Sequence, residues 1–274
     1  MRLATHRLAP GLLLTALLSF VPNVLADFDP QIGQAGSLGI AQSSNLFKAW
    51  ATNVVSIDRG PMNAANPGLG DASSGSFPGL ISLGDGGSIT LKFDNPLYDG
   101  AGADFAVFEN GFLSGGPGLA FLELAFVEVS TDGVNFFRFD ATSLTQTDTQ
   151  VGGFGLLDAS KINNLAGKYI SGYGTGFDLA ELAGRSPLLD VNNINYVRII
   201  DVVGSIDPAY GSYDAFGHLI NDPFTTPFAS SGFDLSAVGA INVASVPEPA
   251  SLATAGIGAT IMAVALRSRR RRDA

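Results

Sequence analysis

The sequence contains no cysteine and only two histidines among its 274 residues. Without a thiol there is no disulfide framework, no cysteine nucleophile and no cysteine-ligated zinc or iron–sulfur cluster. One histidine, His6, lies in a segment that we expect to be removed, which leaves His218 as the one imidazole of the mature chain. A metal site built from several histidines of one chain is thereby excluded.

Charged residues are also scarce, at 15% of the chain against about a quarter in an average globular protein. Most of them are acidic, because residues 27–245 hold 8 Lys and Arg against 23 Asp and Glu. A surface of this sign repels polyphosphates, which argues against nucleic-acid binding. It fits a soluble extracellular protein, or one that collects divalent cations.

The first 26 residues have the three parts of a secretory signal peptide. Arg2 and Arg7 make the start positive, an apolar stretch follows over residues 12–21, and Val24-Leu25-Ala26 is a small-residue cleavage site. About ten apolar residues cannot span a membrane core that needs roughly 20, so an uncleaved anchor fits less well. We therefore expect export.

The C-terminal end contains a proline-rich tripeptide, an apolar run and an arginine cluster, in that order. The run, residues 250–266, has 17 uncharged residues and no polar face. As a helix it reaches about 25 Å, and flanking arginines that snorkel make a membrane span plausible. Arginines hold that end in the cytoplasm by the positive-inside rule, so residues 27–245 are expected outside.

This order of features resembles the PEP-CTERM sorting signal. The resemblance covers residues 246–274 and rests on Pro247, Glu248, Pro249, Arg269, Arg270, Arg271 and Arg272. It implies a Gram-negative bacterium and recognition by an exosortase, a sorting protease. It further implies a transient inner-membrane anchor and release to, or display on, the cell surface.

Residues 27–245 predict a single β-sandwich ectodomain, all-β and jelly-roll-like, between the signal peptide and a single transmembrane helix. Short apolar runs are separated by Gly, Asn, Asp and Pro, with no long helical periodicity. The expected strands are 88–93, 104–108, 196–203 and 238–243. Apolar and polar residues alternate along 88–93, whereas 104–108 is apolar on both faces and is therefore expected to be central in its sheet. A hairpin is expected over 124–139 with its turn at Asp132-Gly133, and one or two helical turns over 178–183.

The segment 127–136, a strand followed by Ser-Thr-Asp-Gly and an aromatic residue, resembles the hairpin of discoidin-like and other galactose-binding-like domains. Residues 80–243, with the segments 104–110, 127–136, 197–201 and 232–238 as landmarks, also resemble an uncharacterised bacterial cell-surface family. These resemblances imply a fold and no particular activity.

Oxygen-bearing side chains are the only potential metal ligands that are abundant in this chain, which favours calcium over zinc. The candidate ligands are Asp104, Glu109, Asn110, Asp201, Asp207, Asp222 and Asp234. Asp104 and Glu109 are five residues apart, so in an extended strand their side chains point to opposite faces. Both reach one site only if the strand ends or bulges between them. The alternative is that these residues form turns and strand caps through their own hydrogen bonds.

Exposed aromatic residues suggest a second hypothesis, carbohydrate binding, because Trp and Tyr in Gly-rich loops stack on sugar rings. The candidates are Trp50, Tyr210 and Tyr213; the alternative is that they plug loops onto the core. An enzyme is not expected: a Ser-His-Asp triad must use His218, and no G-x-S-x-G motif is present.

We therefore predict an exported cell-surface or extracellular-matrix protein that acts as a non-enzymatic structural or binding module, with calcium as the candidate cofactor. Its expected partners are an exosortase, the inner membrane and, on the second hypothesis, an extracellular polysaccharide. The alternative function is a carbohydrate-binding, lectin-like module, and a third is a hydrolase on the same fold, because two carboxylates suffice for a glycosidase.

Overall fold

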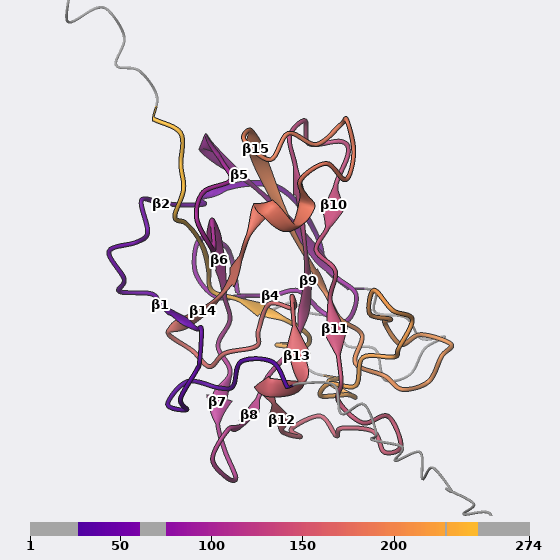
Figure 1. Ribbon diagram of the computed structural model, residues 1–274. Helices are drawn as coiled ribbons and strands as arrows, with labels where there is room; N and C mark the ends of the chain where they lie inside the picture. The colour runs from indigo at the N-terminus through magenta and orange to yellow at the C-terminus, as the bar shows by residue number, and fades with distance from the viewer. Residues whose placement is uncertain (1–26, 61–74, 228, 246–274) are drawn as a thin grey trace, which may run out of the picture.

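The computed structural model describes residues 27–60, 75–227 and 229–245. Within them the chain is almost entirely β, apart from two short 3-10 helices, η1 (Ala159–Lys161) and η2 (Leu179–Leu182). Two five-stranded antiparallel sheets form the layers of a sandwich (Figure 1). The all-β, jelly-roll-like sandwich predicted from the sequence is confirmed.

Each large sheet combines strands that are distant in the chain. Sheet A has the order β1 (Ile40–Ala41), β14 (Tyr173–Phe177), β6 (Phe105–Phe108), β17 (Ala237–Ala240), β2 (Ala49–Trp50). Sheet B has the order β10 (Phe137–Arg138), β9 (Ala125–Ser130), β15 (Ile194–Asp201), β5 (Ser88–Leu97), β3 (Asn53–Asp58).

Three small sheets flank the sandwich. One pairs β11 (Thr142–Ser143) with β13 (Ile162–Asn163), and another pairs β16 (Asp234–Leu235) with β4 (Ile81–Ser82). The third has the order β12 (Leu157–Asp158), β8 (Leu119–Phe121), β7 (Phe112–Leu113).

The main core lies between sheets A and B. Alternate side chains of β5, β9 and β15 point inward and are buried against β6, β14 and β17, as the two-residue period of a strand requires. On the other face of sheet B, Phe126 and the partly buried Ile200 contribute to a second apolar cluster, which the chain between β10 and β13 covers. The fold is thus held together by two apolar layers that share sheet B.

The expected strands are confirmed with shifted ends. Residues 88–93 lie in the longer β5, 104–108 correspond to β6, 196–203 to β15 and 238–243 to β17. β6 is central in sheet A and buried throughout, as its apolar sequence predicted. The hairpin of β9 and β10 forms, but its second strand is only Phe137–Arg138 because Asp132 accepts hydrogen bonds from the amides of Val134 and Asn135 and extends the turn.

The predicted signal peptide (1–26) and the sorting segment (246–274) lie outside the described residues. In the described part of the chain, no helix has the length and apolar character needed to cross a membrane.

Candidate metal centre

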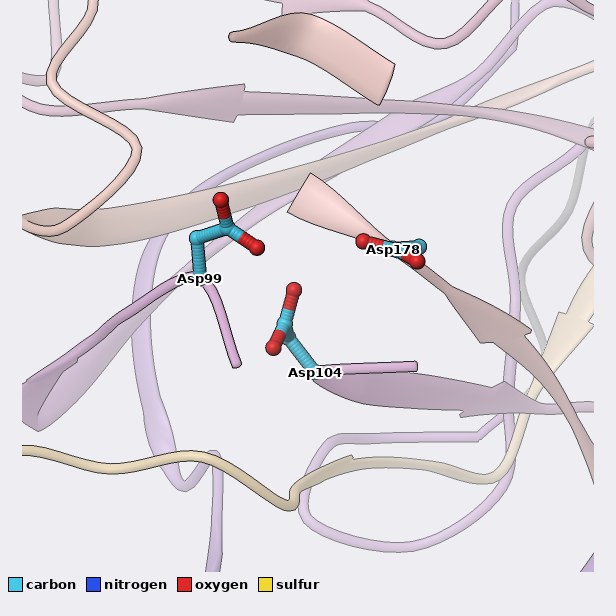
Figure 2. A group of neighbouring side chains, drawn as sticks. All are labelled: Asp99, Asp104 and Asp178. Atoms are coloured by element: carbon cyan, nitrogen blue, oxygen red, sulfur yellow. The ribbon is translucent and has the colours of Figure 1, made fainter. Parts of the chain in front are cut away.

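Three aspartates from three separate strand ends meet at one end of the sandwich. Asp99 follows β5, Asp104 directly precedes β6, and Asp178 directly follows β14. Because β6 and β14 are antiparallel neighbours with Phe105 opposite Phe177, the start of one strand lies beside the end of the other. Figure 2 shows the three carboxylates turned toward a common space.

The three carboxylates are close enough to share one cation. One oxygen from each lies within 4.8 Å of the others, and in the described residues this is the one group of three or more acidic or histidine side chains that meets so closely. Calcium takes oxygen ligands at about 2.3–2.6 Å, so two ligands of the same ion lie up to about 5 Å apart. The spacing therefore suits calcium.

Asp104 is the fixed member of this group. It is fully buried, and its Oδ1 accepts hydrogen bonds from the Gly100 amide and the Asn242 side chain, both at 2.7 Å. Its Oδ2 accepts one from the Leu179 amide at 2.7 Å. Burial raises the pKa of Asp104, and the nearby Asp178 raises it further, while these hydrogen bonds oppose the shift. A bound cation would compensate the ionised Asp104 for its lost hydration and would offset the repulsion from Asp178.

A second collection of carboxylates lies at the other end of the sandwich. Its members are all at most 6% exposed, and we call them the buried acidic cluster: Asp85, Glu109, Glu123, Asp201, Asp222 and Asp234. Glu109 directly follows β6 whereas Asp104 precedes it, so the strand separates the two sites by about 16 Å at about 3.3 Å per residue.

Mutual repulsion links the members of the buried acidic cluster. Burial raises the pKa of Glu123 well above its ordinary value, and Glu109, Asp234, Asp201 and Asp222 each raise it further. Burial likewise raises the pKa of Asp201 and of Asp222, and in both cases Asp85 adds to the shift.

Backbone amides hold some of these carboxylates in place. The Asp201 oxygens accept from the amides of Phe233 at 2.6 Å and Gly86 at 2.8 Å, and Asp222 Oδ2 accepts from Leu124 at 3.1 Å. Gly204 gives Asp222 its room, since a Cβ there would lie 1.5 Å from Oδ1. The local backbone is therefore shaped around carboxyl groups.

The seven ligands predicted from the sequence are divided among three places. Asp104 lies in the three-aspartate site; Glu109, Asp201, Asp222 and Asp234 belong to the buried acidic cluster, where Asn110 donates to Asp234 Oδ2 at 3.0 Å. Asp207 is exposed and accepts from the Ala209 amide at 2.9 Å, a turn-capping contact. The structure does not bring all seven to one ion.

The seven candidate ligands named from the sequence do not include Asp99 and Asp178, the two partners of Asp104. Asp99 and Asp104 stand at the two ends of a Gly-rich loop, which is a weak indication of a shared site. Asp178 precedes an expected helical turn, where an Asp is a frequent cap, so the sequence indicates a structural role for it. The meeting of Asp178 with Asp104 depends on the pairing of β6 with β14, which local sequence does not encode.

The three aromatic residues predicted to bind sugar do not lie together. Trp50 packs on Phe47 and Phe108, with ring centroids 4.9 and 5.6 Å apart, so it partly covers sheet A. Tyr210 and Tyr213 are 39% and 44% exposed and belong to the segment between β15 and β16, which Figure 1 places on the opposite side of the molecule from β2.

Tyr213 lies between two surface hollows. One, of about 350 Å³, is lined by Phe126, Arg138, Asp140, Arg185 and their neighbours; the other, of about 420 Å³, is lined by residues 143–147 and 217–219. Arg185 forms a two-pronged ion pair with Asp140 at 2.7 and 3.0 Å. An exposed ring beside planar charged groups is thus present on this face.

Comparison with known proteins identifies the C-terminal segment. Residues 245–271 match the family model of the PEP-CTERM protein-sorting motif. No curated protein matches the chain. The PEP-CTERM motif marks an exported protein that is sorted to the cell surface, and such signals are recognised by an exosortase, a membrane protease. The discoidin-like resemblance of the middle segment stays a prediction.

Proposed function

We propose that this PEP-CTERM protein is a non-enzymatic structural or binding module of the cell surface, and that calcium bound by Asp99, Asp104 and Asp178 stabilises it. The meeting of these three carboxylates carries the proposal. The match to the sorting motif supports the setting, because extracellular calcium is available to an exported protein.

The position of the site supports a stabilising role. It joins the ends of β5 and β14 to the start of β6, and Asn242, which bonds Asp104, adds the chain that leaves β17. A cation there would hold four segments that are distant in sequence. In a chain without cysteine it would supply the cross-link that disulfides give to other extracellular proteins.

The proposal predicts a calcium-dependent melting temperature. At free calcium about one hundred times the dissociation constant, linkage stabilises the folded state by about 2.7 kcal/mol, which is a rise of about 5–10 °C for a domain of this size. The measurement is thermal unfolding of the full chain in detergent, with calcium and with a chelator.

The test variant is Asp178→Asn, which removes one ligand charge but keeps the cap on η2, since Asn caps as well as Asp. It is expected to lose most of the calcium-dependent rise. Asp207→Asn is the matched control, because Asp207 likewise accepts a hydrogen bond from the backbone amide two residues further on and does not belong to the three-aspartate group. Equal rises in the two variants would exclude this site.

The second candidate function is carbohydrate binding, favoured by the exposed Tyr213 ring between the two hollows. Tyr213→Ala is expected to lower retention on a polysaccharide affinity gel about fivefold or more, because an aromatic ring stacked on a nucleic-acid base supplies about 1–3 kcal/mol and we expect stacking on a sugar ring to be comparable. Tyr98→Ala is the control, since Tyr98 is similarly exposed but lies next to Asp99. Retention unchanged by Tyr213→Ala would rule the surface out.

A further inference from the structure

A small polar hollow lies at the edge of β14 that faces β1. β1 pairs with β14 only at Tyr173 and Gly174, so beyond Gly174 no strand of the described chain lies against this edge. The hollow, which we call the β14-edge hollow, has a volume of about 200 Å³ and shares no residue with the two hollows beside Tyr213. Its polar border includes Asp29, Asn163, Asn164, Lys168, Thr175 and Glu181.

One wall of the β14-edge hollow is a buried ion pair. Lys168 is 2% exposed, and its Nζ donates to Asp29 Oδ1 at 2.6 Å. Asp29 Oδ2 accepts from the Tyr169 hydroxyl and, at 3.4 Å, from the Leu38 amide. An ammonium group has three donors, and the bond to Asp29 is the one hydrogen bond that Nζ makes among the described residues. Lys168 therefore retains donors for an acceptor bound beside it.

Thr175 adds a buried hydroxyl to the same border. It is 5% exposed, and its Oγ1 has no hydrogen-bond partner among the described residues. Thr175 lies on β14 opposite Val107 of β6, within the stretch that β1 does not cover. A buried hydroxyl without a partner loses its bonds to water and gains none in return, which lowers stability. A ligand hydroxyl in the hollow would supply the missing bond.

Planar carboxylate and amide groups form the rim. Asn164 Nδ2 donates to Glu181 Oε2 at 2.6 Å and to the Asp140 carbonyl at 3.2 Å, which fixes Glu181 and Asn164 against each other. Asn163 borders the hollow beside them and brings a second amide. These groups offer both acceptors and donors. The hollow thus has donors on its buried wall and groups of both kinds at its rim.

We propose that the β14-edge hollow binds one neutral sugar unit, a hexose or its N-acetyl derivative. A sugar hydroxyl both accepts and donates, so it can accept from Lys168 and Thr175 while neighbouring hydroxyls donate to Glu181. Asp29 neutralises Lys168, and residues 27–245 hold 8 Lys and Arg against 23 Asp and Glu, which disfavours phosphates and uronates. The volume is below the about 300–1,000 Å³ of sites for drug-sized ligands, so it suits a single ring.

The test is binding of free sugars to the full chain in a detergent without a sugar headgroup, measured by saturation-transfer NMR. The probes are glucose, galactose, mannose and N-acetylglucosamine, each titrated to obtain its dissociation constant. At the ligand efficiency of ordinary small molecules, one hexose corresponds to a dissociation constant on the order of 1 mM. At least one probe is expected to bind on this scale. If none of the four binds at about ten times this concentration, the proposal is overturned.

The test variant is Thr175→Val, which removes the hydroxyl and keeps the shape of the side chain. It is expected to raise the dissociation constant of the bound sugar about fivefold or more, because one hydrogen bond from a buried group is lost. Without sugar it is expected to melt no lower than the wild type, since this hydroxyl has no partner among the described residues. Thr175→Ser restores a hydroxyl and is expected to keep most of the affinity. An unchanged dissociation constant in a folded Thr175→Val variant overturns the proposal.

Two controls separate this site from the others. Tyr213→Ala, in the other two hollows, is expected to leave the dissociation constant unchanged. If Tyr213→Ala abolishes binding and Thr175→Val does not, the sugar belongs to the other surface and the inference is wrong. No member of the three-aspartate site borders the β14-edge hollow, so binding is expected to persist in chelator whether or not that site holds calcium. Binding that requires calcium would contradict the inference.

Discussion

Phe105→Ala is expected to destabilise the folded protein by about 3–5 kcal/mol, the cost of removing a buried phenylalanine and leaving a cavity. Phe105 is fully buried at the centre of sheet A. Its ring stacks on Phe177 at 5.4 Å and contacts Phe139 at 6.0 Å. These contacts join β6 to β14 and to the chain after β10, so the cavity would affect both sheets. Urea unfolding of the full chain in detergent measures the loss.

Phe216→Ala is the control for this substitution. Phe216 is 67% exposed, and its truncation is expected to change stability by no more than about 0.5 kcal/mol. Similar losses in the two variants would contradict the assignment of the core between sheets A and B.

Without calcium, the folded protein is expected to lose stability as the pH rises from about 4. The responsible carboxyl groups have a pKa raised by burial: Glu109, Glu123, Asp201, Asp222 and Asp234. The folded state holds their protons at pH values where the unfolded chain has released them. Their stabilising effect is complete below the unfolded pKa, near 4, and disappears as the pH passes the folded pKa.

Each unit of raised pKa corresponds to about 1.4 kcal/mol per group, so several groups together give one of the largest effects expected here. The measurement is the urea midpoint between pH 4 and 8 in chelator. Asp132, whose pKa is lowered by hydrogen bonds from Asn135 and Val134, acts in the opposite direction but below this range. Stability that is constant or rising from pH 4 to 8 in chelator would contradict the prediction, and added calcium is expected to reduce the loss.

The sandwich was predictable where apolar pattern and strand coincide. Ile89, Leu91 and Phe93 alternate along β5 and are all buried, and the apolar β6 is central as expected. β14 was missed because two glycines interrupt its sequence, Tyr-Gly-Thr-Gly-Phe, and glycine is depleted in strands. It is a strand because its glycines allow close packing: a Cβ at Gly174 would lie 2.8 Å from the Phe108 ring.

The sequence shows that carboxylate ligands are abundant, but it does not show which carboxylates lie together in one site. Asp104 and Glu109 are five positions apart and were grouped as ligands of one ion, yet β6 occupies the residues between them and carries them to opposite ends. Asp178 joins Asp104 across 74 positions through strand pairing alone. Which carboxylates meet depends on the sheet order, and no local pattern specifies that order.

The chain that follows β17 stays attached to one end of the sandwich. Ala244 donates its amide to the Pro96 carbonyl at 2.9 Å, so the polypeptide is still fastened to the fold three positions before Pro247. The described chain therefore ends at the pole of Asp99 and Asp104, opposite the pole that bears the β7–β8 hairpin in Figure 1.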